Sequence, residues 1–214
     1  TLMDGPPMPQ PNKPLAGLKV IELGTLIAGP FAARICAEFG AQVTKVESPD
    51  GGDPLRKWRK LYEGTSLWWF VQARNKRSIT LNLKHPQGRE VLMKLLAEAD
   101  ILIENFRPGV LEKLGFGWDV LHALNPRLVM VRLSGFGQTG PMKDQPGFGA
   151  VGESMGGLRY ITGFEDRPPV RTGISIGDSI AALWAVIGAL MALRQREVNG
   201  GQGQIVDVAL YEAV

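Results

Sequence analysis

Short apolar runs alternate with longer amphipathic stretches along the first two thirds of the chain. The apolar, β-branched runs predict strands over residues 18–23, 42–47, 78–83, 101–105 and 128–133. The stretches between them predict helices over residues 29–39, 86–99, 110–114 and 119–124. Gly29 and Pro30 open the first helix and Gly40 follows its end, which are favoured positions for these residues.

This alternation predicts an α/β fold in which helices cover both faces of a parallel, Rossmann-like sheet. Right-handed crossovers would bring the loops that follow the strands to one edge of the sheet. Open parallel sheets bind their ligands at that edge. Functional residues are therefore expected directly after the predicted strands.

The last third of the chain has a different pattern. Residues 134–176 are rich in glycine and lack periodicity, which predicts a long connection that is functional or locally structured, with a solvated surface loop as the alternative. Residues 180–193 are the most apolar segment. They fall short of the roughly 20 residues that cross a bilayer, so they predict a buried core helix and no membrane association. Residues 207–214 are expected to lie within a helix.

Composition narrows the class of protein. With 44% hydrophobic and 21% charged residues, a chain of 214 residues forms a globular domain with a sizeable core. A net charge of +3 is too small for a dedicated nucleic-acid binder and is compatible with an anionic small ligand. A single cysteine, Cys36, excludes an internal disulfide and favours a cytoplasmic location. Residues 1–13 hold four prolines and predict a flexible arm ahead of one domain over residues 14–214.

Common cofactor and metal motifs are absent from the sequence. Residues 24–30, GTLIAGP, follow the first predicted strand where a dinucleotide-binding protein has GxGxxG, and GxxxxGK[ST] does not occur. His85 and His122 are the only histidines, and neither has metal-ligand or catalytic-triad spacing. The sequence therefore predicts no metal site and argues against catalysis by histidine.

Basic residues gather near the ends of two predicted strands. They are Arg74, Lys76, Arg77 and Lys84 around one strand, and Arg107 and Lys113 after the next. If these strands are adjacent, their carboxyl ends would present the charges to one crevice that suits phosphates. The alternative is an ordinary solvated run of charges.

Asp178 opens the apolar segment and follows residues 171–176, RTGISI. A carboxylate at this place would cap a helix by accepting hydrogen bonds from the free N–H groups of its first turn, which is the commoner role. It would also be available as a nucleophile. The local pattern alone leaves both roles open.

A series of motifs, in this order along residues 14–214, resembles the family III CoA-transferases, also called the CaiB/BaiF family. The motifs are residues 14–23 (PLAGLKVIEL), 28–30 (AGP), 40–47 (GAQVTKVE), 75–78 (NKRS), 104–109 (ENFRPG) and 177–178 (GD). The family also includes formyl-CoA transferase, carnitine CoA-transferase and α-methylacyl-CoA racemase. Its members are about twice as long as this chain, so the resemblance implies the N-terminal part of the family's large domain, without the small domain.

The resemblance implies that Asp178 is the catalytic nucleophile and that coenzyme A enters as a substrate rather than as a tightly bound cofactor. Asp178 would attack an acyl-CoA thioester to form a mixed anhydride, and returning CoA would form an aspartyl-CoA thioester. The helix N-terminus would keep Asp178 ionised. An interlocked homodimer is the assembly that the resemblance implies.

The resemblance also assigns contacts to CoA. Leu26, Ile27 and Ala28 would follow the pantetheine, Leu81, Asn105 and Phe106 would border the adenine, and Lys84 and Lys113 would face phosphates, with Arg107 close by. Two departures argue against formyl-CoA chemistry. Formyl-CoA transferases have a histidine where this chain has Thr25, and a basic residue where it has Ser48.

The acyl group is suggested by residues 169–173, PVRTG, which resemble family members that transfer CoA from succinyl-CoA to other dicarboxylates. Arg171 is the candidate for binding the far carboxylate of such a substrate, because its guanidinium pairs with a carboxylate through two hydrogen bonds. A structural arginine that pairs with a nearby carboxylate is the alternative.

Two further alternatives concern the whole function. The racemase of the family uses a histidine ahead of its aspartate, where this chain has residues 147–149, GFG, so racemisation is disfavoured. A non-catalytic CoA-binding or assembly module also fits a chain of this length. An incomplete large domain would leave apolar helix surface for another chain to cover.

Overall fold

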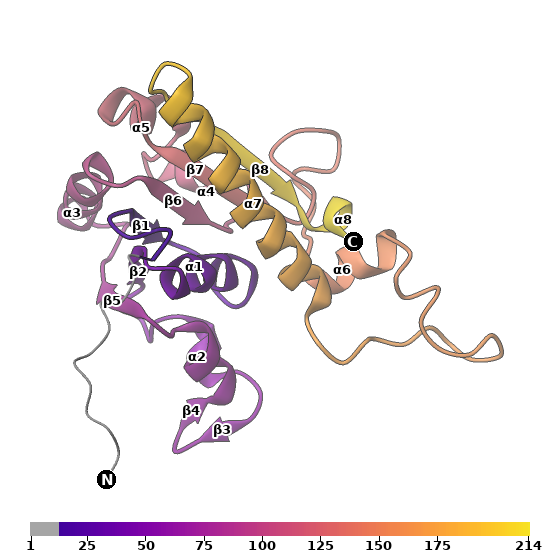
Figure 1. Ribbon diagram of the computed structural model, residues 1–214. Coiled ribbons are helices and arrows are strands. Elements are labelled where there is room, and N and C mark those ends of the chain that lie inside the picture. Colours follow the sequence, from indigo (N-terminus) through magenta and orange to yellow (C-terminus); the bar gives the residue numbers. More distant parts are fainter. Residues whose placement is uncertain (1–12) are drawn as a thin grey trace, which may run out of the picture.

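The computed structural model describes residues 13–214, and the arm expected over residues 1–13 lies outside the described residues except for Lys13. Six parallel strands form one sheet: β1 (Lys19–Glu22), β2 (Gln42–Glu47), β5 (Lys76–Thr80), β6 (Ile101–Glu104), β7 (Val129–Ser134) and β8 (Ile205–Ala209). Their spatial order is β5-β2-β1-β6-β7-β8. Figure 1 shows this sheet running through the middle of the molecule.

Helices cover both faces of the sheet. One face carries α1 (Ala28–Glu38) and α7 (Ile176–Val198), and the other carries α3 (Pro86–Ala97), α4 (Val110–Lys113) and α5 (Trp118–Leu124). Val20 packs into the first of these cores and its neighbour Ile21 into the second, because successive strand residues point to opposite faces. The predicted α/β fold with a parallel sheet is confirmed.

The order of the strands reverses between β1 and β6. The chain leaves β1 toward β2 and β5 on one side, then returns to β6 and continues to β7 and β8 on the other. Loops that leave two such neighbours in opposite directions open a crevice at the carboxyl ends of the strands. The crevice here lies beyond Glu22 and Glu104, the last residues of β1 and β6.

Two expectations for individual elements are wrong, and a third becomes more specific. The strand expected over residues 78–83 is β5 at Lys76–Thr80, because it pairs in register with β2. The connection over residues 134–176 is locally structured, as one of its readings expected: it contains a helix, α6 (Gly149–Met155), which packs against α7 and the C-terminal helix α8 (Leu210–Ala213). Strand β8 pairs with β7 where a helix was expected.

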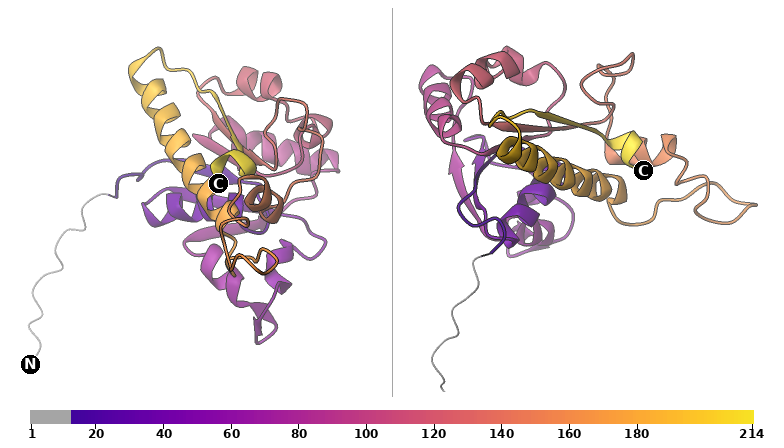
Figure 2. Two further views of the ribbon diagram at one scale, coloured as in Figure 1. Left: turned by 90° about the vertical axis from the view of Figure 1, so that its right-hand side faces the viewer. Right: turned by 45° about the horizontal axis from the view of Figure 1, so that its top comes forward.

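A small excursion separates β2 from β5. It consists of a short 3-10 helix (Pro54–Lys57), the hairpin of β3 (Leu61–Tyr62) and β4 (Thr65–Ser66), and α2 (Leu67–Gln72). The excursion lies at the bottom of the view in Figure 1. The segment between α6 and α7 extends away from the sheet on another side, as Figure 1 and the right-hand view of Figure 2 show.

Helix α7 is longer and more exposed than the buried core helix expected over residues 180–193. It has 23 residues, and its alanines, Ala181, Ala182, Ala185, Ala189 and Ala192, are buried on the sheet side. Its opposite side exposes Leu183, Trp184, Ile187, Leu190 and Met191. Among the described residues, α7 alone is long and apolar enough to cross a membrane, a test that core helices of soluble proteins also pass.

Candidate functional site

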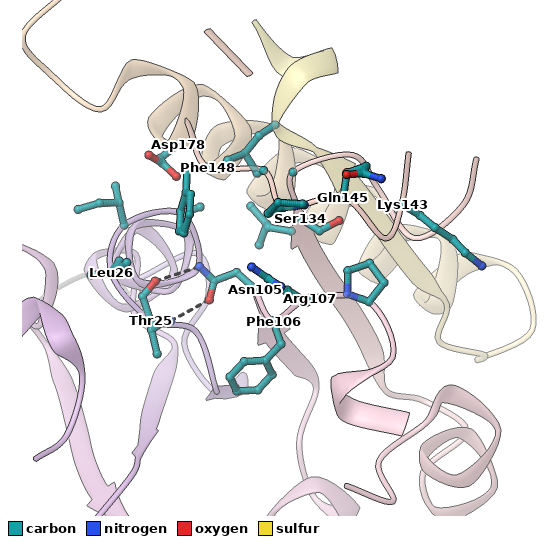
Figure 3. A pocket seen from close by; sticks show the side chains of 18 residues that line it. Thr25, Leu26, Asn105, Phe106, Arg107, Ser134, Lys143, Gln145, Phe148 and Asp178 are labelled. Atoms are coloured by element: carbon teal, nitrogen blue, oxygen red, sulfur yellow. Dashed lines mark hydrogen bonds between the residues drawn. The ribbon is translucent and has the colours of Figure 1, made fainter. Parts of the chain in front are cut away.

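The loop after β1 and the loop after β6 are tied together at the switch point. Asn105 accepts a hydrogen bond from the backbone N–H of Thr25 on Oδ1 at 2.8 Å, and its Nδ2 donates to the carbonyl of Thr25 at 2.9 Å (Figure 3). The side-chain amide of Asn105 thus bonds to the neighbouring loop through both of its ends. We conclude that Asn105 shapes the crevice.

Leu26 has a left-handed backbone conformation, with φ at 61°, which is unfavourable for a leucine. Such a conformation persists where surrounding groups hold it. Here the Leu26 N–H donates to Oδ1 of Asp53 at 3.0 Å, and Asp53 is itself buried. The chain segment that opens the crevice is therefore held from Asn105 on one side and from Asp53 on the other.

A buried ion network lies beneath this segment. Lys45 places its Nζ 2.8 Å from Oε1 of Glu22, 2.9 Å from Oδ2 of Asp53 and 2.7 Å from the carbonyl of Gly24. Burial acts to lower the pKa of Lys45, but Glu22 and Asp53 outweigh it, so the pKa lies above its ordinary value. Lys45 thus remains charged and links β1 to the loop that carries Asp53.

The prediction that the basic residues near the two strand ends face one crevice is wrong in part. Strands β5 and β6 are separated by β2 and β1, so their ends do not adjoin. The side chain of Lys76 is buried at the start of β5, where its Nζ lies 2.7 Å from Oε2 of Glu22 and donates to the carbonyl of Pro30. Burial lowers the pKa of Lys76 despite the nearby Glu22. Lys76 is therefore part of the core network and does not face the crevice.

A cavity of about 140 Å³ lies over the switch point. Its wall includes Asp178 together with six of the residues expected at the site, namely Leu26, Ile27, Ala28, Asn105, Phe106 and Arg107. Figure 3 shows Asp178 beside Phe148 at one end of the cavity and Lys143 at the other. Segments about 150 residues apart in the sequence thus meet in one cavity.

A second cavity, of about 350 Å³, adjoins the first because Phe106 lines both. Leu81 and Lys84 line this second cavity, as do Lys45 and Asp53 of the buried network. Lys113 is exposed on α4 and lines neither cavity, and Arg171 also lies outside the residues that line them. Of the predicted site residues, all but Lys113 and Arg171 therefore line the two adjoining cavities.

Asp178 is not the N-cap residue of α7. The cap position is Ser175, so Asp178 is the third residue of the helix. Burial and, to a smaller extent, the charge of Glu153 raise the pKa of Asp178 from 3.8 to about 6, against the opposing charge of Arg171. A carboxyl with this pKa is still mostly ionised at neutral pH, although the loss of hydration favours its neutral form.

Gly149, the first residue of α6, lies directly against Asp178. A Cβ atom at this position would be 2.9 Å from Cγ of Asp178 and would collide with its carboxylate oxygen Oδ2. Only glycine fits this contact without displacing the side chain. The glycine-rich connection therefore forms one side of the Asp178 pocket, which favours its functional role over a solvated loop.

Sequence reasoning missed three residues of the site: Lys45, Asp53 and Glu153. Glu153 is fully buried, and Arg171 lies with its Nε 3.7 Å from Oε2 of Glu153. The sequence does carry a signal for the buried ion network: charged residues lie at or near the ends of the buried strands β1, β2 and β6. No local signal marks Glu153, whose hydrogen-bond partner Gly177 lies 24 residues away.

The described residues contain no cluster of metal-ligating side chains. Across residues 13–214, no group of three or more histidine, cysteine, aspartate or glutamate side chains is arranged to hold a metal ion. The wall of the cavity instead combines one carboxylate, backbone groups and two cations, Arg107 and Lys143. This combination suits an anionic organic ligand and a carboxylate that reacts with it.

Two relatives from Chloroflexus aurantiacus are similar to this chain in sequence. Succinyl-CoA–D-citramalate CoA-transferase is 57% identical over 206 residues, which cover 96% of this chain and 51% of that protein. The beta subunit of succinyl-CoA–L-malate CoA-transferase is 51% identical over 203 residues, which cover 94% of this chain and 50% of that protein. The chain thus spans about half the length of the curated relatives it matches.

Structural similarity points the same way. A CaiB/BaiF family protein from Brucella suis matches with a TM-score of 0.90 and 40% identity, over 94% of this chain and 54% of that one. A protein from Mycobacterium tuberculosis matches with a TM-score of 0.87 and 32% identity, over 95% and 56% of the two chains. The family model for CoA-transferase family III matches residues 15–214. The chain therefore belongs to CoA-transferase family III.

Proposed function

We propose that this protein transfers coenzyme A from an acyl-CoA donor to a carboxylic acid, with Asp178 as the covalent carrier. The observation that carries the proposal is the position of Asp178, a partly desolvated carboxylate in the same cavity as Leu26–Ala28 and Asn105–Arg107. The names of the two relatives support succinyl-CoA as the donor and a dicarboxylic acid as the acceptor.

The reaction proceeds in four exchanges. The Asp178 carboxylate attacks the carbonyl of the donor thioester, and the C–S bond breaks to leave a mixed anhydride and CoA thiolate. The thiolate attacks the Asp178 carbonyl, releases the donor acid and forms an aspartyl-CoA thioester. The acceptor carboxylate then attacks this thioester and frees CoA again. Attack of CoA on the acceptor carbonyl of the second anhydride forms the new acyl-CoA and restores Asp178.

Covalent catalysis suits a reaction between two carboxylic acids. An acceptor carboxylate is a weak nucleophile, and the anhydride and thioester intermediates must be protected from hydrolysis. Burial removes water from Asp178, which makes its carboxylate more reactive, and a pKa of about 6 leaves it mostly ionised at neutral pH. The rate of CoA transfer should therefore increase as the pH rises through about 6.

We propose that CoA follows the two adjoining cavities. Leu26, Ile27 and Ala28 would contact the pantetheine close to Asp178, while Leu81 and Lys84 would bind the nucleotide end in the second cavity. Phe106 lines both cavities and would lie between these parts. Lys113 is exposed and lines neither cavity, so these cavities give no support to its contact with a phosphate.

Mass spectrometry of the protein after incubation with succinyl-CoA tests the proposed function. The covalent intermediates should be trapped with hydroxylamine or by reduction, and the modification should map to the peptide that contains Asp178. An adduct elsewhere in the chain, or CoA transfer without any adduct on Asp178, would contradict the assignment of the nucleophile.

Arg171 is proposed to bind the far carboxylate of the acid substrate. Its side chain is 41% exposed, so part of the guanidinium is free to bind a ligand while Nε faces Glu153. Arg171→Ala should reduce transfer to a dicarboxylate about 10-fold to 100-fold more than transfer to a monocarboxylate, since one charge-assisted contact is lost. Arg167→Ala, in the same segment and exposed, is the control. Equal losses for both acceptors would leave Arg171 a structural role only.

A second chain is proposed to cover the outer side of α7, as in an interlocked homodimer. The support is the row of apolar side chains exposed there, from Leu183 to Met191, next to a groove of about 320 Å³ between α7 and β8. Sedimentation velocity should give a particle larger than a monomer. A monomer that binds no hydrophobic dye would refute this. Because one relative is named as a beta subunit, a second chain of different sequence is the alternative outcome.

A cytoplasmic location also stays a prediction.

A further inference from the structure

Glu153 is a buried carboxylate on α6 that the proposed reaction does not use. Its side chain is fully buried, and its Oε1 accepts a hydrogen bond from the backbone N–H of Gly177 at 3.5 Å. Gly177 lies in the first turn of α7, whose N-cap residue Ser175 makes no side-chain capping bond. Glu153 therefore supplies, from another helix, an acceptor for an N–H group that α7 does not satisfy itself.

The contact between the two helices is close. A Cβ atom at Gly177 would lie 3.3 Å from Cγ of Glu153 and 3.1 Å from the carbonyl oxygen of Gly149. Gly149 and Glu153 are four residues apart on α6, so they share one face of that helix. That face touches Asp178 through Gly149 and the residue before Asp178 through Glu153. The position of α6 thus determines the space available to the Asp178 carboxylate.

The second oxygen of Glu153 is not hydrogen-bonded. Within residues 13–214, Oε2 has no hydrogen-bond partner, although it is buried. Two guanidinium groups approach it without reaching hydrogen-bond distance, with Nε of Arg171 at 3.7 Å and Nε of Arg159 at 3.9 Å. A buried carboxylate needs such positive neighbours, because an uncompensated charge is costly away from water.

We propose that Glu153 is a positioning residue for Asp178: it caps the first turn of α7 from α6, and its charge, balanced by Arg171, acts on the neighbouring Asp178 carboxylate. This inference rests on the proposed role of Asp178. The charged groups around Asp178 are Glu153 from α6, Arg159 and Arg171 from the next segment, and Arg107 and Lys143 on the cavity wall. Glu153 acts to raise the pKa of Asp178 and Arg171 acts to lower it.

Direct titration of Asp178 tests the electrostatic part. The side-chain carboxyl carbon of aspartate would be labelled with ¹³C and followed by NMR, with Asp178→Asn used to assign its signal. Glu153→Gln keeps an oxygen that accepts the Gly177 N–H and removes the charge, so the midpoint should move to lower pH. Arg171→Gln removes the opposing charge, so the midpoint should move to higher pH. Glu165→Gln, an exposed carboxylate in the same segment, should leave it unchanged.

Hydrogen exchange tests the capping part. Glu153→Leu removes both the charge and the acceptor, so the amide of Gly177 should exchange at least about 10-fold faster than in Glu153→Gln, which keeps the bond. Equal exchange in the two variants would overturn the capping role. If Glu153→Gln does not fold, the titration midpoint of Asp178 in Arg171→Gln tests whether Arg171 balances the charge. An unchanged midpoint in that variant would overturn the proposal.

These measurements do not depend on CoA transfer. An Asp178 that titrates as expected but forms no adduct with succinyl-CoA would refute the proposed function and leave the electrostatic coupling standing. An Asp178 that forms the adduct while its midpoint is unchanged in Glu153→Gln would retain the function and refute the coupling. The two proposals therefore fail separately.

Discussion

Asp178→Asn is expected to abolish CoA transfer while making the folded protein more stable at neutral pH. Asparagine has nearly the same shape as aspartate but is not a nucleophile toward a thioester. Removal of a covalent nucleophile lowers the rate on the order of 10⁴-fold or more. The trapped adduct on the peptide that contains Asp178 should disappear as well, and both can be measured with succinyl-CoA as donor.

The gain in stability follows from the direction of the pKa shift. The carboxyl of Asp178 has a pKa of about 6 in the folded protein and 3.8 as its ordinary value, so the folded state holds the proton more tightly. Stability from this group is complete below the lower value and is lost as the pH rises through the higher one. At neutral pH the ionised Asp178 therefore costs free energy, on the order of 3 kcal/mol. Asparagine removes this cost.

Urea unfolding between about pH 4 and pH 8 measures this effect. The variant should have a higher free energy of unfolding than the original protein. This difference should be largest at the highest pH and vanish toward the lowest pH. Asp166→Asn, at an exposed position, is the control and should show no such trend. An inactive variant that is also less stable at every pH would mean that loss of activity reflects damage to the fold.

Lys45→Met is expected to cause a large loss of stability. Methionine has a similar length, but it leaves the carboxylates of Glu22 and Asp53 without the cation that lies 2.8 Å and 2.9 Å from them. Breaking a buried ion pair from one side costs about 3–5 kcal/mol, because a charge remains buried and uncompensated. Urea unfolding should show this as a lower free energy of unfolding.

The same variant should disturb the site. Asp53 holds the N–H of Leu26, whose backbone conformation is unfavourable for a leucine, and Lys45 holds Asp53. The affinity for CoA should therefore fall. Lys94→Met is the matched control, since Lys94 pairs with Glu90 on the exposed side of α3 and should be replaceable without measurable effect. Equal stability of Lys45→Met and the original protein would contradict the role of the network.

The local sequence pattern was sufficient to predict those strands and helices in which the apolar positions and the boundary residues indicate the same element. Strand β2 occupies residues 42–47 as predicted, and α1, β6 and α5 differ by one residue or a few at their ends. Their ends are marked by proline, glycine or a charged residue, and their apolar residues face the cores. The wrong assignments occur where another segment of the chain decides the structure. Strand β5 begins at the charged Lys76 because β2 lies beside it and Glu22 neutralises it.

The sequence by itself determined the alternation of strands and helices, the parallel sheet, and the motifs that single out Asp178 and the loops after β1 and β6. Tertiary structure alone decided that Lys76 is buried, that Asn105 bonds to Thr25, and that Glu153 lies beside Asp178. The reason is that patterns of hydrophobicity and turn residues act between neighbours in the chain. The charge of a carboxylate depends on its burial and on ions a few ångströms away, and those neighbours come from distant segments that only folding brings together.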